Sequence, residues 1–202
     1  MVAEGLEWRE SARIRSYESD ARGMATVATI CNIMQECASN HANHLGFGVD
    51  ELNERGAIWA LSRIGVEILR RPAIGERVTV NTWLLESRGP FAIREFSILD
   101  EQENILVQSK YAWLAIDLIT KRSVRPETLM KDMPINTKKK PLSNNLKKIR
   151  FPEKPISLTP IHVRKSDLDI QSHVNNSRYI AWIEDALDEY NVKKSSIYTN
   201  AS

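Results

Sequence analysis

The chain has 202 residues and a formal net charge of +2, with 42% hydrophobic and 27% charged residues. This composition excludes a disordered chain, and the length allows one or two small domains with buried cores. No apolar run is long enough for a membrane helix, and the charged N-terminus fits neither a secretory signal nor an organelle transit peptide, so we expect a cytoplasmic protein. The two cysteines, Cys31 and Cys37, suit a reducing compartment, because a helix would hold them too far apart for a disulfide bond.

The first predicted element is an amphipathic helix. Asp20 can cap its start, and apolar residues recur at steps of three and four between Met24 and Ala38. Gly46 and Gly48 end this pattern. We therefore expect one long helix that buries a single face.

Four segments rich in Val, Ile, Thr, Trp and Phe follow the helix and are typical of β-strands. The last three follow one another at hairpin distances, which favours an antiparallel sheet. A long apolar helix beside one sheet has to be wrapped by it, so we expect an α+β fold. The predicted strands are Ala57–Leu69, Glu76–Glu86, Phe91–Leu99 and Ile105–Asp117.

Residues 121–154 differ from the rest of the chain in charge. They hold eleven basic and three acidic residues, a net charge of +8 that leaves −6 for the remainder, together with four prolines and a fifth, Pro155, directly after them. This composition is typical of an irregular, exposed linker, so we expect a domain boundary near residues 130–155. The run from Lys138 to Lys140 lacks the interleaved aromatic residues of a nucleic-acid site, but it could attract an acidic protein.

The chain aligns with itself at an offset of 149 residues. Arg15 then falls on Arg164 and Asp20 falls on Asp169, and the apolar phase of the first helix matches that of a second helix predicted at Val174–Tyr190. This second copy has a strand and a helix, and the sequence ends before a further sheet. We therefore expect either that this sequence is a C-terminally truncated fragment or that another chain supplies the surface against which the second helix packs.

The densest polar cluster lies just before the second helix. Asp169, Gln171 and His173 alternate, so an extended segment would place them on one side, and Asn175 and Asn176 can cap the helix that follows. Free N–H groups at a helix N-terminus suit a carbonyl oxygen or an oxyanion, and a histidine beside a carboxylate suits proton transfer to or from water. The alternative is that Asp167 or Asp169 caps the helix and His173 fills a polar turn.

The element Asp-Leu-Asp-Ile-x-x-His-Val-Asn-Asn-x-Arg-Tyr-Ile-x-Trp, which ends at Trp182, resembles the signature of the acyl-acyl carrier protein (acyl-ACP) thioesterases. The motifs Asn40-His41-Ala, Gly46-Phe-Gly48 and Trp59-Ala-Leu-Ser-Arg63 also resemble that family's first unit. The resemblance implies tandem hot-dog folds, each a long helix wrapped by an antiparallel sheet. The corresponding domains are a first unit at 1–130, a basic linker at 131–156 and an incomplete second unit at 157–202.

The resemblance also implies a hydrolase that releases free fatty acid from acyl-ACP. It makes His173 the general base or water-orienting group and Asp169 its electrostatic partner, with Asn175 and Asn176 as the scaffold that binds substrate. Gln171 stands where the family usually has Asn, and its amide can still polarise a thioester carbonyl.

Two further features of the family concern the substrate and the missing strands. Trp59 would line the interior of the first unit, where the acyl chain would lie. A Cys or Glu that the family carries on a later strand of the second unit has no counterpart here, and Cys31 and Cys37 are not substitutes for it.

Two alternative functions stay open, an acyl-CoA thioesterase and an inactive acyl-binding remnant. We expect no cofactor and no metal, because His41 and His44 lack a third ligand with matching spacing and a helix C-terminus favours histidine. The expected partner is an acyl carrier protein bearing a fatty acyl chain, rather than a nucleic acid or a membrane. An exposed apolar face on the second helix could also lead to homo-oligomers.

Overall fold

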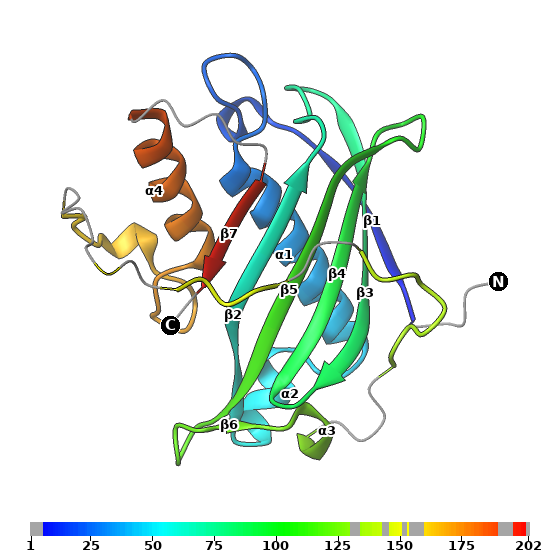
Figure 1. Cartoon of the computed structure of the whole chain (residues 1–202), viewed down its shortest axis with the longest axis vertical. Coiled ribbons are helices and arrows are strands. Elements are labelled where there is room, and N and C mark those ends of the chain that lie inside the picture. Colours follow the sequence, from blue (N-terminus) through cyan, green and yellow to red (C-terminus); the bar gives the residue numbers. More distant parts are fainter. Residues whose placement is uncertain are drawn as a thin grey trace.

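The computed structural model describes residues 6–129, 134–142, 146–150, 153, 160–189 and 196–200. One antiparallel sheet with strand order β1-β3-β4-β5-β2-β7 runs through these residues, and β6 pairs with β5 (Figure 1). The strands are β1 (Trp8–Arg13), β2 (Ala57–Ile68), β3 (Arg77–Arg88), β4 (Phe91–Leu99), β5 (Ile105–Asp117), β6 (Ser123–Val124) and β7 (Ser196–Asn200). The helices are α1 (Val27–His44), α2 (Val49–Glu54), α3 (Pro126–Leu129) and α4 (Asn176–Glu189), with single 3-10 turns η1 (Ser16–Glu18) and η2 (Lys165–Asp167).

The four strands predicted from the sequence are confirmed as β2 to β5, with ends within two residues of the expected positions. Alternation along β4 shows why they form a sheet with two different faces. Phe96 and Ile98 belong to the core beneath α1, whereas Ile93 joins a separate apolar cluster. Gly89 allows the tight β3–β4 turn, because its φ of 62° is costly for other residues.

The predicted long helix is confirmed as α1, but the predicted cap is wrong. The side chain of Thr26 accepts a hydrogen bond from the backbone N–H of Thr29 at 3.0 Å, so the helix starts at Val27. The sheet covers one side of α1, and Ile30 and Met34 are fully buried between them (Figure 1). This buried contact between the helix and the sheet is the main core of the protein.

The described part of the basic segment lies on the sheet face opposite α1, where it crosses in front of β4 and β5 in Figure 1. Lys110 and the fully buried Glu95 form an ion pair of 3.0 Å on that face, and both contact the backbone of Leu142. Lys139 bonds Glu7 at 2.8 Å and lies over a tryptophan ring. The segment is therefore partly packed, although its composition predicts only an exposed linker.

The second copy contributes α4 and β7. The predicted helix at Val174–Tyr190 is confirmed as α4, which starts two residues later than expected and packs beside α1, with Ile180 in the main core. β7 is the one strand among the described residues after 157. It pairs with β2 at the sheet edge, where Ile197 lies opposite Val66. In the described ranges, no helix has the length and apolarity needed to cross a membrane.

Candidate active site

The polar cluster predicted from the sequence forms a tight turn before α4. The backbone N–H of Asp169 donates to the carbonyl of His173 at 2.7 Å. The Asp169 carboxylate oxygen Oδ1 in turn accepts hydrogen bonds from the N–H groups of Gln171 at 2.9 Å and His173 at 3.0 Å. Ser172 takes a positive φ of 62°, which lets the chain reverse within this turn. Asp169 therefore fixes the backbone of the cluster.

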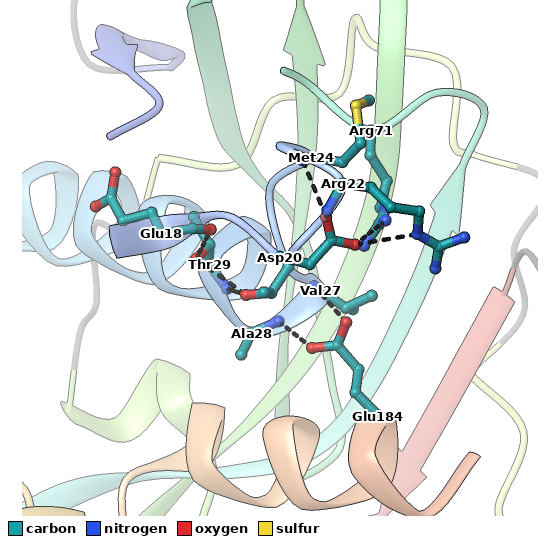
Figure 2. Close-up of polar contacts among 10 residues, drawn as sticks. Glu18, Asp20, Arg22, Met24, Val27, Ala28, Thr29, Arg71 and Glu184 are labelled. Atoms are coloured by element: carbon teal, nitrogen blue, oxygen red, sulfur yellow. Dashed lines mark hydrogen bonds and ion pairs between the residues drawn. The ribbon is translucent and has the colours of Figure 1, made fainter. Parts of the chain in front are cut away.

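The first copy contains the same turn 149 residues earlier, drawn in Figure 2. The N–H of Asp20 donates to the carbonyl of Met24 at 2.8 Å, and its Oδ1 accepts from the N–H groups of Arg22 at 2.9 Å and Met24 at 3.1 Å. Gly23 has a φ of 74° where the second copy has Ser172. The internal repeat is therefore present at the level of single hydrogen bonds, but the first copy carries methionine in place of His173.

The start of α4 is fixed by Asn175 and Asp167. Asn175 Oδ1 accepts hydrogen bonds from both the N–H and the hydroxyl of Ser177, each at 2.9 Å. Asp167 is buried and bonds Arg178 at 2.6 Å. A hydrogen bond from the backbone N–H of Arg164, together with Arg178, lowers the pKa of the Asp167 carboxyl. These contacts hold the helix N-terminus in place beside the turn.

A cavity of about 380 Å³ opens at this turn, between the C-terminal half of α1, the start of α2 and the sheet. Its walls are largely apolar, with Leu84, Trp113 and Phe47 among them, and Trp59 is held there by a hydrogen bond to the Phe47 carbonyl at 3.1 Å. Its polar end is made by the turn and the α4 N-terminus. Five of the six predicted site residues line it: Trp59, Asp169, Gln171, Asn175 and Asn176.

His173 is the predicted site residue that the structure places outside the cavity lining. Its side chain is exposed, and its contact with Asp169 is made by its backbone N–H. Within the described ranges, the Asp169 carboxylate thus holds the turn and forms no bond with the His173 ring. This geometry differs from the expected carboxylate–imidazole pair. The role of His173 as general base stays a prediction.

Arg94 is a cavity residue that the sequence analysis did not single out. It is 8% exposed, and its Nη1 lies 2.9 Å from Nδ1 of His41 and 3.2 Å from the hydroxyl of Thr82. Burial lowers the pKa of the Arg94 guanidinium to about 10. Arginine inside an apolar strand was the signal that could have pointed to it.

The two histidines considered as metal ligands have other contacts. His41 is fully buried against Arg94, and the ring of His44 lies 4.9 Å from that of Trp8. No group of three or more His, Cys, Asp or Glu side chains suited to a metal ion occurs in the described part of the chain.

Both thiols are expected to be unreactive in the folded protein. Cys31 and Cys37 are buried and free, and burial raises the pKa of each to about 12. Ellman's reagent at pH 8 should therefore label neither thiol in the native protein and both thiols in guanidinium chloride. Rapid native labelling of either residue would contradict the packing of α1.

Comparison with known proteins shows the family to which this chain is similar. Residues 5–132 match the family described as "Acyl-ACP thioesterase N-terminal domain", and residues 152–199 match "Acyl-ACP thioesterase C-terminal domain". The chain is 31% identical over 207 residues to oleoyl-acyl carrier protein thioesterase 1, chloroplastic, from Arabidopsis thaliana, which covers 94% of this chain and 57% of the relative. It is 32% identical over 199 residues to palmitoyl-acyl carrier protein thioesterase, chloroplastic, from Cuphea hookeriana, which covers 91% of this chain and 47% of the relative. The chain thus spans about half the length of these curated relatives.

Solved structures agree with these sequence matches. An acyl-ACP thioesterase from Bacteroides thetaiotaomicron superposes with a TM-score of 0.80 at 26% identity, covering 100% of this chain and 83% of that one. A 12:0-ACP thioesterase from Umbellularia californica superposes with a TM-score of 0.79 at 25% identity, covering 100% of this chain and 84% of that one. The predicted hot-dog architecture, a long helix wrapped by an antiparallel sheet, is confirmed.

Proposed function

Because the chain belongs to the acyl-ACP thioesterase family, we propose that it hydrolyses the thioester between a fatty acyl chain and acyl carrier protein and releases the free fatty acid. The observation that carries this proposal is the cavity between α1 and the turn before α4. Its apolar walls suit a fatty acyl chain, and its polar end suits the thioester. Five of the predicted site residues meet there.

The acyl chain would lie along the apolar walls. Trp59 and Trp113 enter the cavity from adjacent strands of the sheet, and Leu84 lines it from a third. Burying a methylene group in such surroundings contributes roughly 0.8 kcal/mol, so binding of the chain would be driven chiefly by its hydrocarbon. The thioester would then lie at the polar end, beside Gln171 and Asn176.

The reaction would be a direct attack of water. His173 takes a proton from water as the water oxygen bonds to the thioester carbon, and the amide of Gln171 donates a hydrogen bond to the carbonyl oxygen as it becomes an oxyanion. The carbon–sulfur bond then breaks, and His173 returns its proton to the carrier thiolate. The exposed position of His173 supports this role in one respect, because water reaches the ring freely.

The proposal includes a division of the chain into three parts. They are a first unit at 1–130, a linker at 131–156 and part of a second unit at 157–202. The repeated turns at Asp20 and Asp169 support it, and it would make the site a joint product of both units. A cytoplasmic location also stays a prediction, whereas the matched plant relatives are named as chloroplastic.

The proposal predicts that the purified protein releases oleate or palmitate from the matching acyl-ACP, with a kcat/KM at least tenfold above that for the corresponding acyl-CoA. Quantifying free fatty acid by mass spectrometry, with carrier alone as the blank, measures this directly. A preference for acyl-CoA would favour the alternative of an acyl-CoA thioesterase. A folded protein that binds oleate but hydrolyses neither thioester would be an acyl-binding remnant.

A further inference from the structure

The N-terminus of α1 is occupied by a carboxylate from the other copy of the repeat. Glu184 reaches from α4 and accepts hydrogen bonds from the backbone N–H groups of Val27 at 2.8 Å and Ala28 at 2.9 Å (Figure 2). These are two of the N–H groups that a helix leaves without an internal partner, and the positive end of the helix dipole favours an anion there. In the first copy, the N-terminus of α1 thus binds a pair of acceptor oxygens.

The offset of 149 residues gives the equivalent place in the second copy. Glu184 aligns with Gln35, and Val27 aligns with Asn176. Gln35 and Asn176 both line the cavity. Among the described residues no acceptor contacts the N–H of Asn176. Ala28 aligns with Ser177, whose N–H already donates to Asn175 Oδ1, so of the two N–H groups that a carboxylate binds at α1 the one at Asn176 is open at α4, inside the candidate active site.

We propose that Gln35 is a further substrate-binding catalytic residue, which holds the thioester carbonyl oxygen together with the N–H of Asn176. This rests on the proposed function and extends its site to α1. A glutamate at position 35 would offer acceptors only and would bind the N–H of Asn176, as Glu184 binds that of Val27. The amide of glutamine carries two donors and no charge, so it can share a carbonyl oxygen with the backbone N–H. Both donors would bind more tightly to the oxyanion than to the carbonyl.

Two opposite substitutions at equivalent positions, Gln35→Glu and Glu184→Gln, test the role of Gln35. Gln35→Glu should lower kcat at least about tenfold and leave KM within about threefold, because the acyl chain still binds while the oxyanion loses the amide of Gln35 and the N–H of Asn176 and keeps Gln171 as a donor. Its melting temperature should not fall, since the new carboxylate caps α4. Glu184→Gln should lower the melting temperature by about 2–4 °C and leave kcat within about twofold. Equal losses of kcat in the two variants, or an unchanged kcat in Gln35→Glu, would overturn the assignment.

A binding measurement separates this inference from the proposed hydrolysis. The 2-oxoheptadecyl thioether of pantetheine keeps a carbonyl group but cannot be hydrolysed, and the heptadecyl thioether lacks the carbonyl. Gln35→Glu should weaken binding of the first probe about tenfold in calorimetry and leave binding of the second unchanged. If the wild type hydrolyses no thioester but this difference appears, the proposed function fails and the assignment of Gln35 stands. Equal effects on both probes would overturn the assignment alone.

Discussion

Replacing His173 by Ala is expected to lower kcat for acyl-ACP hydrolysis by about 100-fold or more, the usual scale for a positioned acid–base group. The same change should shift the melting temperature by less than about 2 °C. The turn depends on the backbone N–H of His173, which alanine keeps, and the side chain is exposed. Rate and melting temperature should be measured on one preparation of the variant.

His162→Ala is the matched control, because His162 is also exposed and precedes the turn in the second copy. It should leave both quantities unchanged. If His173→Ala retains the wild-type rate within a few-fold, His173 is a turn residue, and the base that activates water has to be sought among the residues that line the cavity.

Replacing Asp169 by Ala is expected to lower both stability and activity. It removes the acceptor of two backbone hydrogen bonds, from Gln171 and His173, and so releases the turn that carries the catalytic groups. The free energy of unfolding should fall by about 1–3 kcal/mol, and kcat by about 100-fold, since displaced groups cannot act on the thioester. Urea unfolding and steady-state kinetics measure the two effects. Asp169→Asn keeps the acceptor oxygen and should recover most of the stability.

The first copy supplies the control for Asp169. Asp20 accepts the same two backbone hydrogen bonds and also pairs with Arg71 (Figure 2). Asp20→Ala should therefore destabilise the protein at least as much as Asp169→Ala, while the protein that remains folded keeps its kcat. Equal losses of kcat from both substitutions would mean that Asp169 affects activity only through general stability.

The sequence predicted the helix and four strands correctly because each carries a strong local pattern. The apolar stripe of α1 and the β-branched runs of β2 to β5 bury the faces expected of them. The edge strand β1 was missed, since its sequence Trp-Arg-Glu-Ser-Ala-Arg alternates only between half-buried and exposed positions. Its hydrogen-bond partners lie in β3, from Arg13 opposite Arg77 to Trp8 opposite Thr82, and no local pattern indicates pairing between segments so far apart in the chain.

Only part of the site could be predicted from the sequence, and Asp20 and Asp169 show the physical reason why the rest could not. A carboxylate that caps a helix and one that closes a turn use the same bonds to backbone N–H groups, so composition alone does not distinguish them. The structure gives both residues the turn, and Thr26 caps α1 instead. Arg94 and Gln35 reach the cavity only through tertiary packing, and Gln35 becomes recognisable through its alignment with Glu184.

A structure of the protein bound to the 2-oxoheptadecyl thioether of pantetheine tests the central claim most directly, because it shows where a thioester mimic binds. We expect the alkyl chain along Trp59 and Trp113 and the carbonyl oxygen within hydrogen-bond distance of the Asn176 N–H, with His173 facing the carbonyl carbon. A ligand bound on the other face of the sheet, or with its carbonyl away from the turn at Asp169, would contradict the assignment of this cavity as the active site.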